Sequence, residues 1–204
     1  LEVVASRVSV VARIAQQLIE VLAVRVDEVM RFCLLLDWRC LKITIGVIEG
    51  DIKTDTDAQK IRDAGGEAVQ IETQGACHLS AEQVHRALKE LNAKELDVVI
   101  IENVGNLVCP AAFDLGEAQR VILLSVPEGD DKPIKYPGTF AEADVVLINK
   151  IDLADYIDFN LERALGDIRV VNPDVEIFQV SATTGEGMDQ WYNWLLDKNK
   201  HDKG

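Results

Sequence analysis

A chain of 204 residues is long enough for one α/β domain with a sizeable core and too short for two comfortable ones. Its formal net charge of −14 argues against nucleic acid or an anionic membrane as the main partner, because an acidic surface repels phosphate groups. The sequence has no apolar run long enough to span a membrane and no start resembling a secretory signal, which predicts a cytoplasmic protein.

The first 42 residues are the least regular part of the sequence. Residues 8–36 are rich in Val, Leu, Ile and Ala, with charged residues at irregular helical spacing, and they predict one or two helices. Their many β-branched residues weaken that prediction, since such side chains lower helix propensity. We expect a first strand at residues 1–5 and an atypical helical segment over residues 1–42 as a whole. Cys33 and Cys40 lie in this segment, and we assign them no role.

From residue 41 onward, short apolar runs alternate with helical patterns. Strands are predicted at residues 41–48, 68–71, 96–101, 120–126, 144–148 and 176–180, and helices at 55–64, 81–91, 157–171 and 187–198, with Ser80 as an N-cap. This alternation is typical of a three-layer α/β sandwich with a mostly parallel sheet of about six or seven strands. We expect the core to occupy residues 43–197 and a frayed tail, rich in Lys and Asp, to occupy residues 198–204.

The most informative strand end is Asn149-Lys150-Ile151-Asp152, which follows an apolar run with the composition of a buried parallel strand. A carboxylate such as Asp152 can accept the paired N–H donors on one edge of guanine, whereas adenine presents the opposite polarity there. Asn149 would then hold the other edge of the base, and the stem of Lys150 would lie across the ring. An ordinary strand followed by a polar turn explains these four residues equally well when they are taken alone.

Three other strand ends support a nucleotide site. Glu102 places a carboxylate at a strand end, and Gly105 offers bare backbone to a terminal phosphate. Ser181 and Ala182 can offer a backbone N–H to the guanine carbonyl, and Asp51 is placed for a magnesium ion or an attacking water. The order of these motifs along the chain is that of a GTPase.

The phosphate loop of such enzymes has no counterpart in this sequence. Its pattern, Gly-x-x-x-x-Gly-Lys-Ser/Thr, supplies backbone N–H groups and a lysine that cradle the phosphates. The pattern occurs nowhere in the chain. Either the sequence is altered in this region or the protein has lost tight phosphate binding.

A second group of residues has the chemistry of a soft metal site. Cys77 and His78 stand where a loop meets a helix, and Cys109 follows a strand end by several residues. Two thiolates and one imidazole suit nickel or zinc, and four-coordination needs another ligand or a second subunit. The alternative is two buried cysteines and a surface histidine, because the spacing lacks a Cys-x-x-Cys pair.

Several longer motifs resemble the hydrogenase nickel-incorporation GTPases, the HypB family, over about residues 43–194. They are Val-Ile-Glu-Gly-Asp at 47–51, Gly-Ala-Cys-His-Leu at 75–79, Ile-Glu-Asn-Val-Gly-Asn-Leu-Val-Cys-Pro at 101–110, Glu-Gly-Asp-Asp-Lys-Pro at 128–133 and Ile-Asn-Lys-Ile-Asp at 148–152. The resemblance implies a P-loop GTPase-like fold of the dimerising, nucleotide-dependent class. It also implies a GTP-dependent metallochaperone that assists nickel insertion into the large subunit of [NiFe]-hydrogenase, together with other maturation accessory proteins.

The resemblance also assigns residues. It implies nickel or zinc at Cys77, His78 and Cys109 on the interface of a metal- and nucleotide-dependent homodimer, with His85 at most an auxiliary ligand. By the same resemblance, Asp51 and Glu102 serve magnesium and catalysis, and Asp152 selects the guanine of GTP. The alternative function is a nickel- or zinc-binding dimer that no longer hydrolyses GTP, having lost the phosphate loop.

Overall fold

The computed structural model describes residues 20–25, 44–51, 56–63, 65–105 and 108–201. Seven strands form one sheet: β1 Glu20–Arg25, β2 Ile45–Asp51, β3 Glu67–Glu72, β4 Val98–Asn103, β5 Gln119–Ser125, β6 Val145–Asn149 and β7 Glu176–Val180. Their order is β3-β2-β4-β1-β5-β6-β7, and each pair of neighbours is parallel. The predicted parallel sheet is therefore confirmed.

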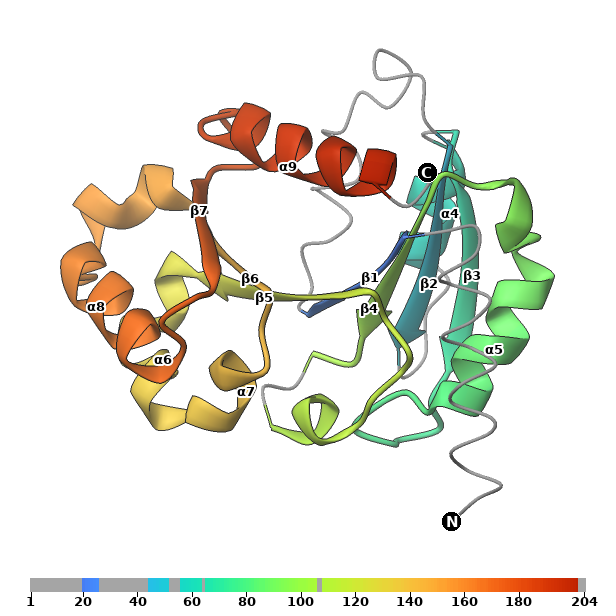
Figure 1. Cartoon of the computed structure of the whole chain (residues 1–204), viewed down its shortest axis with the longest axis horizontal. Coiled ribbons are helices and arrows are strands. Elements are labelled where there is room, and N and C mark those ends of the chain that lie inside the picture. Colours follow the sequence, from blue (N-terminus) through green and yellow to red (C-terminus); the bar gives the residue numbers. More distant parts are fainter. Residues whose placement is uncertain (1–19, 26–43, 52–55, 64, 106–107, 202–204) are drawn as a thin grey trace.

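Helices cover both faces of the sheet (Figure 1). They are α4 Thr56–Asp63, α5 Ala81–Glu90, α6 Lys132–Lys135, α7 Pro137–Ala141, α8 Leu161–Val171 and α9 Met188–His201, with short 3-10 turns η1 Ala93–Glu95, η2 Cys109–Ala112, η3 Val126–Glu128 and η4 Ile151–Tyr156. Buried residues of α4 and α9 share one apolar cluster with the sheet, while those of α5, α7 and α8 pack on the opposite face. The three-layer sandwich is confirmed as well. None of the described helices has the length and apolar character needed to cross a membrane.

Strand β6 shows how the sequence places its core. Val145 and Leu147 face the cluster under α9, and Val146 and Ile148 face the cluster under α7 and α8. All four are buried, because a parallel strand covered on both faces needs apolar residues at every position. The next residue, Asn149, is polar and equally buried, so the first candidate site residue stands directly after the apolar run.

The prediction of one or two helices over residues 8–36 is wrong in the part that the structure describes. Residues Glu20–Arg25 form strand β1 at the centre of the sheet, between β4 and β5. Short runs rich in Val and Leu satisfy either periodicity, and pairing with two neighbours favours the extended conformation. The predicted strand at residues 1–5 lies outside the described residues. The rest of the predicted helical region, residues 8–19 and 26–36, lies outside them as well.

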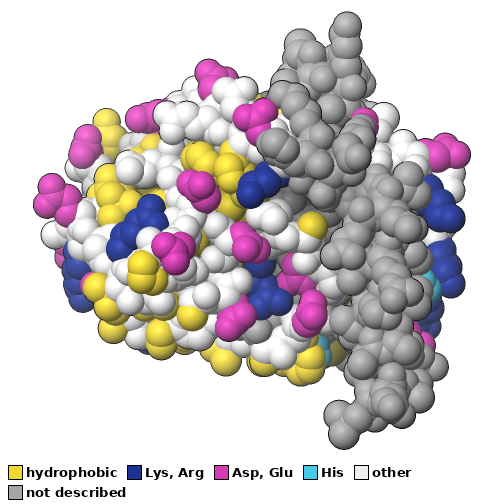
Figure 2. Space-filling model, in the orientation of Figure 1, with side chains coloured by type: hydrophobic (Ala, Val, Ile, Leu, Met, Phe, Trp, Pro, Cys, Tyr) yellow, Lys and Arg dark blue, Asp and Glu magenta, His cyan; other side chains and the backbone are white. Residues whose placement is uncertain are grey.

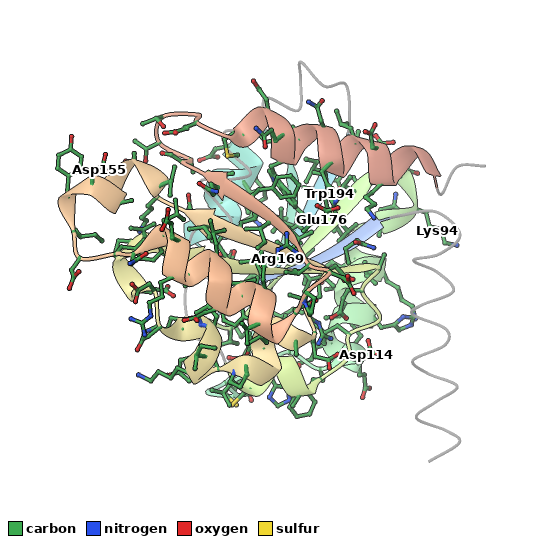
Figure 3. The ribbon with its side chains drawn as sticks, turned by 60° about the vertical axis from the view of Figure 1, so that its left-hand side comes forward. Lys94, Asp114, Asp155, Arg169, Glu176 and Trp194 are labelled. Atoms are coloured by element: carbon green, nitrogen blue, oxygen red, sulfur yellow. The ribbon has the colours of Figure 1, made fainter. Side chains whose placement is uncertain are left out.

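The predicted frayed tail is also partly wrong, because α9 continues to His201. Lys is a good helix former, and the Lys198 ammonium lies 5.3 Å from the ring centre of Trp194. The ring of Trp194, labelled in Figure 3, packs edge-on against Phe178 of β7 and stacks on Trp191, which also belongs to α9. This aromatic anchoring extends the helix beyond the point that composition indicates.

The surface agrees with the acidic composition. Figure 2 shows Asp and Glu side chains spread over the described part of one face, with Lys and Arg between them.

Candidate functional site

The structure brings together two of the motifs predicted to bind guanine. Asn149 ends β6 and is fully buried, and its Oδ1 accepts hydrogen bonds from the backbone N–H of Lys150 at 2.7 Å and of Ala182 at 3.4 Å. Lys150 adopts a left-handed conformation, with φ 62°, which turns the chain from the strand into η4. One amide side chain thus joins the ends of β6 and β7.

Asp152 lies in the first turn of η4, next to this junction. Its Oδ1 is buried and has no hydrogen-bond partner among the described residues. An unpaired buried acceptor costs about 1–3 kcal/mol, so native structures seldom keep one without a reason. A ligand with N–H donors would satisfy it, as the guanine prediction requires.

Ser181 and Ala182 occupy a tight turn after β7. The Ser181 side chain is fully buried, and its Oγ accepts hydrogen bonds from Thr183 N at 3.3 Å and Thr184 N at 3.1 Å. Gly187 closes the turn with φ 71°, and a Cβ at this residue would meet the Gln179 carbonyl oxygen at 2.0 Å. These hydrogen bonds and the close approach at Gly187 hold the backbone of the turn from Ser181 to Gly187.

Carboxylates gather at the end of β2 and β4, on the side predicted for magnesium. Glu49 of β2 and Glu102 of β4 are register partners and are both buried. Asp51 follows Glu49 by two residues and is the last residue of β2. Carboxylate oxygens are the ligands that magnesium prefers, and the buried pair of Glu49 and Glu102 supplies two such groups. Gly105 lies two residues beyond β4 and is exposed.

Sequence reasoning missed Glu49 as a site residue. Two carboxylates buried side by side repel each other unless a cation or a proton compensates them. The available signal was Glu49 standing two residues before Asp51 in the same strand, which predicts a shared face. Its pairing with Glu102 depends on strand order and register, which only the fold reveals.

Two contacts hold the loop that carries Cys77 and His78. Leu79 is fully buried, and a Cβ on Gly50 of β2 would lie 2.8 Å from its Cγ, so the missing side chain makes room for it. The Leu79 backbone N–H donates to Oδ1 of Asn103, the last residue of β4, at 2.9 Å. The loop is thereby tied to the ends of β2 and β4.

Helix α5 begins directly after this loop, as predicted. The Ser80 side chain accepts from Gln83 N while the Gln83 side chain accepts from Ser80 N, which forms a capping box. His85 lies farther along α5, and its Nδ1 is buried without a hydrogen-bond partner among the described residues. An auxiliary role of His85 in metal binding stays a prediction.

The Cys109 segment lies beside the Cys77 loop. Cys109 opens η2, and Phe113, four residues later, stacks on His78 with ring centres 3.7 Å apart. The Cys77 sulfur lies 3.7 Å from His78 Nδ1, and neither Cys77 nor Cys109 forms a disulfide. Yet no three His, Cys, Asp or Glu side chains of the described residues come close enough to hold a metal ion. One described chain therefore does not assemble the predicted ligand set.

Removing the Asn103 side chain tests the anchor of this loop. We expect Asn103→Ala to lower the free energy of unfolding by about 1–3 kcal/mol, because the buried Leu79 N–H and the Val104 N–H both lose their acceptor. Urea denaturation followed by circular dichroism would measure it. The control is Asn193→Ala, at an exposed position on α9. Equal stability of the two variants would contradict the anchoring role.

Comparison with known proteins shows the family to which the chain belongs. A family model described as the CobW/HypB/UreG nucleotide-binding domain matches residues 35–179. The signal recognition particle 54 kDa protein from Aeropyrum pernix K1, at 13% identity and a TM-score of 0.55, shares the fold alone. This chain belongs to the CobW/HypB/UreG nucleotide-binding family, and within it to the HypB proteins.

The similarity to HypB is found in sequence and in structure. The hydrogenase maturation factor HypB of Escherichia coli strain K12 is 51% identical over 153 residues, which are 75% of this chain and 53% of that protein. The crystal structure of HypB from Helicobacter pylori in complex with nickel matches with a TM-score of 0.88 at 34% identity, covering 97% of this chain and 95% of that one. The chain spans about half the length of the first curated relatives it matches.

Proposed function

We propose that this chain is a GTP-dependent metallochaperone that assists nickel insertion during [NiFe]-hydrogenase maturation. The observation that carries the nucleotide part is the junction of Asn149 with Ala182 beside the unpartnered Oδ1 of Asp152. Relatives named hydrogenase maturation factor, and a relative crystallised with nickel, support the cargo and the pathway. Hydrogenase accessory proteins and the hydrogenase large subunit are the proposed partners.

In this proposal each nucleotide-site residue has a separate task. Asp152 accepts the two N–H donors of guanine, Lys150 covers the ring with its stem, and the turn at Ser181 and Ala182 donates a backbone N–H to the base carbonyl. The rigid turn and the buried Asn149 keep these groups aligned, so little order has to be gained on binding.

Magnesium is the proposed resident ion of the phosphate side. Asp51 and Glu102 would hold it, with Glu49 beside Glu102 adding negative charge to the pair. When bound, the ion would neutralise charge on the phosphate oxygens. Gly105 would let the backbone approach a terminal phosphate.

Nickel is the proposed cargo of the protein, and zinc is the ion that would compete for the same ligands. Cys77 and Cys109 would bind as thiolates and His78 as a neutral imidazole. Because three side chains leave a four-coordinate ion incomplete, we propose that a second copy of the chain completes the site across a two-fold axis. The dimer would therefore depend on metal.

A second function, a metal-binding dimer without GTPase activity, is favoured by one observation. The chain contains no Gly-x-x-x-x-Gly-Lys-Ser/Thr, its first glycine is Gly46, and its first lysine is Lys42. Strand β1 is thus followed by Val26-Asp27-Glu28 rather than by a glycine-rich loop. Without that loop, backbone N–H groups and a lysine are not offered to the phosphates in the usual way.

Phosphate release with magnesium separates the two functions. We expect binding of GTP in preference to ATP, with weak affinity and slow phosphate release, because the residues proposed to read the base are present while the phosphate-loop motif is not. A phosphate-sensor assay would follow the unchanged chain beside Glu102→Gln. Release that Glu102→Gln abolishes supports the GTPase, whereas absent release with intact nickel uptake selects the second function.

A further inference from the structure

We propose that Phe113 is a positioning residue for metal binding, which orients the imidazole of His78. The two rings are nearly parallel, with centres 3.7 Å apart and planes inclined by 7°. Phe113 has no metal-binding atom, so it would act only through His78. This inference rests on the proposed function, because it concerns the same metal site.

Stacking restrains the imidazole without blocking it. The lone pairs that bind a metal lie in the plane of the ring, at Nδ1 and Nε2, while Phe113 covers a face of the ring. The Nδ1 edge lies 3.7 Å from the Cys77 sulfur, so an ion taken up by the thiolate would meet the edge of His78. The rotamer freedom of His78 is restricted on folding rather than on metal binding, which raises affinity.

The contact also joins two separate segments of the predicted site. His78 follows Cys77 in the loop before α5, and Phe113 comes directly after η2, which begins at Cys109. The 3.7 Å stack is therefore a bridge between the Cys77 segment and the Cys109 segment. Losing the ring would remove this contact between the two segments and the stacking restraint on His78.

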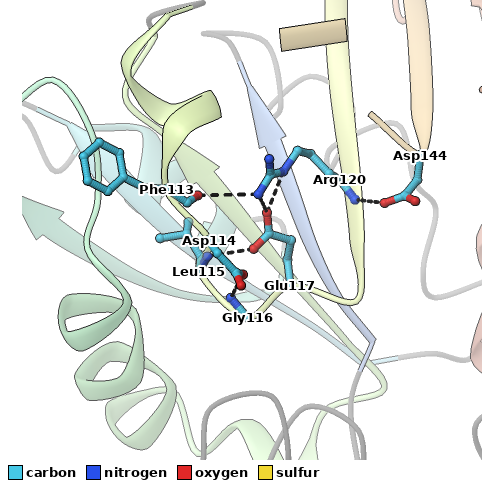
Figure 4. A network of polar contacts seen from close by, with 7 residues as sticks. All are labelled: Phe113, Asp114, Leu115, Gly116, Glu117, Arg120 and Asp144. Atoms are coloured by element: carbon cyan, nitrogen blue, oxygen red, sulfur yellow. Dashed lines mark hydrogen bonds and ion pairs between the residues drawn. The ribbon is translucent and has the colours of Figure 1, made fainter. Parts of the chain in front are cut away.

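A partly buried ion pair between Arg120 and Glu117 holds the backbone that carries Phe113. Phe113 is 43% exposed, so burial alone does not fix its ring. Glu117 Oε1 accepts from Arg120 Nε at 2.7 Å, and Glu117 Oε2 accepts from the N–H of the buried Leu115 at 2.8 Å. Arg120 also donates to the Phe113 carbonyl oxygen at 3.5 Å, and its backbone N–H donates to Asp144 (Figure 4). These contacts tie the loop to β5.

Nickel titration of Phe113 variants tests the inference. We expect Phe113→Leu, which keeps apolar bulk but loses the flat ring, to raise the Kd for nickel about threefold to tenfold. Phe113→Tyr keeps the ring and should bind within about twofold of the unchanged chain. In a His78→Ala background, Phe113→Leu should have no further effect, because its partner is gone.

A metal-free measurement accompanies the titration. The chain has three histidines, and the ring protons of His78 should be displaced upfield by the Phe113 ring in nuclear magnetic resonance spectra. Phe113→Leu should abolish this displacement, and Phe113→Tyr should retain it.

The outcomes separate the inference from the metal-site proposal. Unchanged nickel affinity in Phe113→Leu, or an equal loss in the His78→Ala background, would overturn the positioning role while the metal site stands. If the unchanged chain takes up no nickel at all, the metal-site proposal falls and this inference falls with it.

Discussion

Asp152→Asn is expected to lower the affinity for guanine nucleotides about a hundredfold or more and to favour xanthine nucleotides. The carboxylate can accept both N–H donors on one edge of guanine, whereas an amide offers one acceptor and one donor group. Xanthine carries a carbonyl where guanine carries its amino group, so it suits the amide. The buried, unpartnered Oδ1 of Asp152 makes the effect large, since a mismatched group there would stay unsatisfied.

Titration with fluorescent guanosine and xanthosine diphosphates would measure both affinities. Asp155→Asn is a matched control, because it removes the same charge from the same 3-10 turn. Asp155 is exposed, so its side chain is not part of the proposed site (Figure 3). The control should bind like the unchanged chain. Unaltered guanine preference in Asp152→Asn would refute the assignment, and guanine binding that is absent from the unchanged chain would refute the nucleotide site itself.

Cys77→Ala and Cys109→Ala are each expected to weaken nickel binding about a hundredfold or more. Removing an outer-shell partner already costs about tenfold to a hundredfold in metal affinity, and these thiolates would contact the ion directly. Thiols must lose protons on binding, so uptake by the unchanged chain should also fall as the pH is lowered. Competition with a chromophoric chelator would measure the affinities.

The same variants test assembly. Stoichiometric nickel should shift the unchanged chain from the mass of a monomer to that of a dimer in light scattering, and Cys77→Ala should stay monomeric. Cys40→Ala is the control, because it removes a thiol to which no ligand role is assigned. Equal mass and equal metal uptake in the unchanged chain and Cys77→Ala would show that the cysteines are packing residues.

Much of the fold could be predicted because local patterns and tertiary packing agree there. The apolar run that ends at Asn149 has strand composition on both faces, and it is buried on both. Ser80 carries its own helix-start signal, which needs only residues within the next turn. The short helices α6 and α7 were missed, since four- and five-residue helices carry too little periodicity.

Strand β1 shows where local patterns fail. Glu20–Arg25 lies in a stretch whose Val and Leu spacing suits a helix as well as a strand. The choice is made by hydrogen bonding to β4 and β5, which come more than seventy residues later in the sequence. A partner at that separation leaves no local signal.

By itself the sequence determined which groups are available: a carboxylate at Asp152 that we predict selects guanine, the thiols and imidazole of Cys77, His78 and Cys109 that we predict bind metal, and no phosphate-loop motif in the given sequence. Only the tertiary structure decided which of them meet. Asn149 reaches Ala182, Glu49 lies beside Glu102, and the Phe113 ring stacks on His78 because strand order and register bring distant segments to one edge of the sheet. Residue chemistry is local, whereas proximity depends on contacts between residues far apart in the chain.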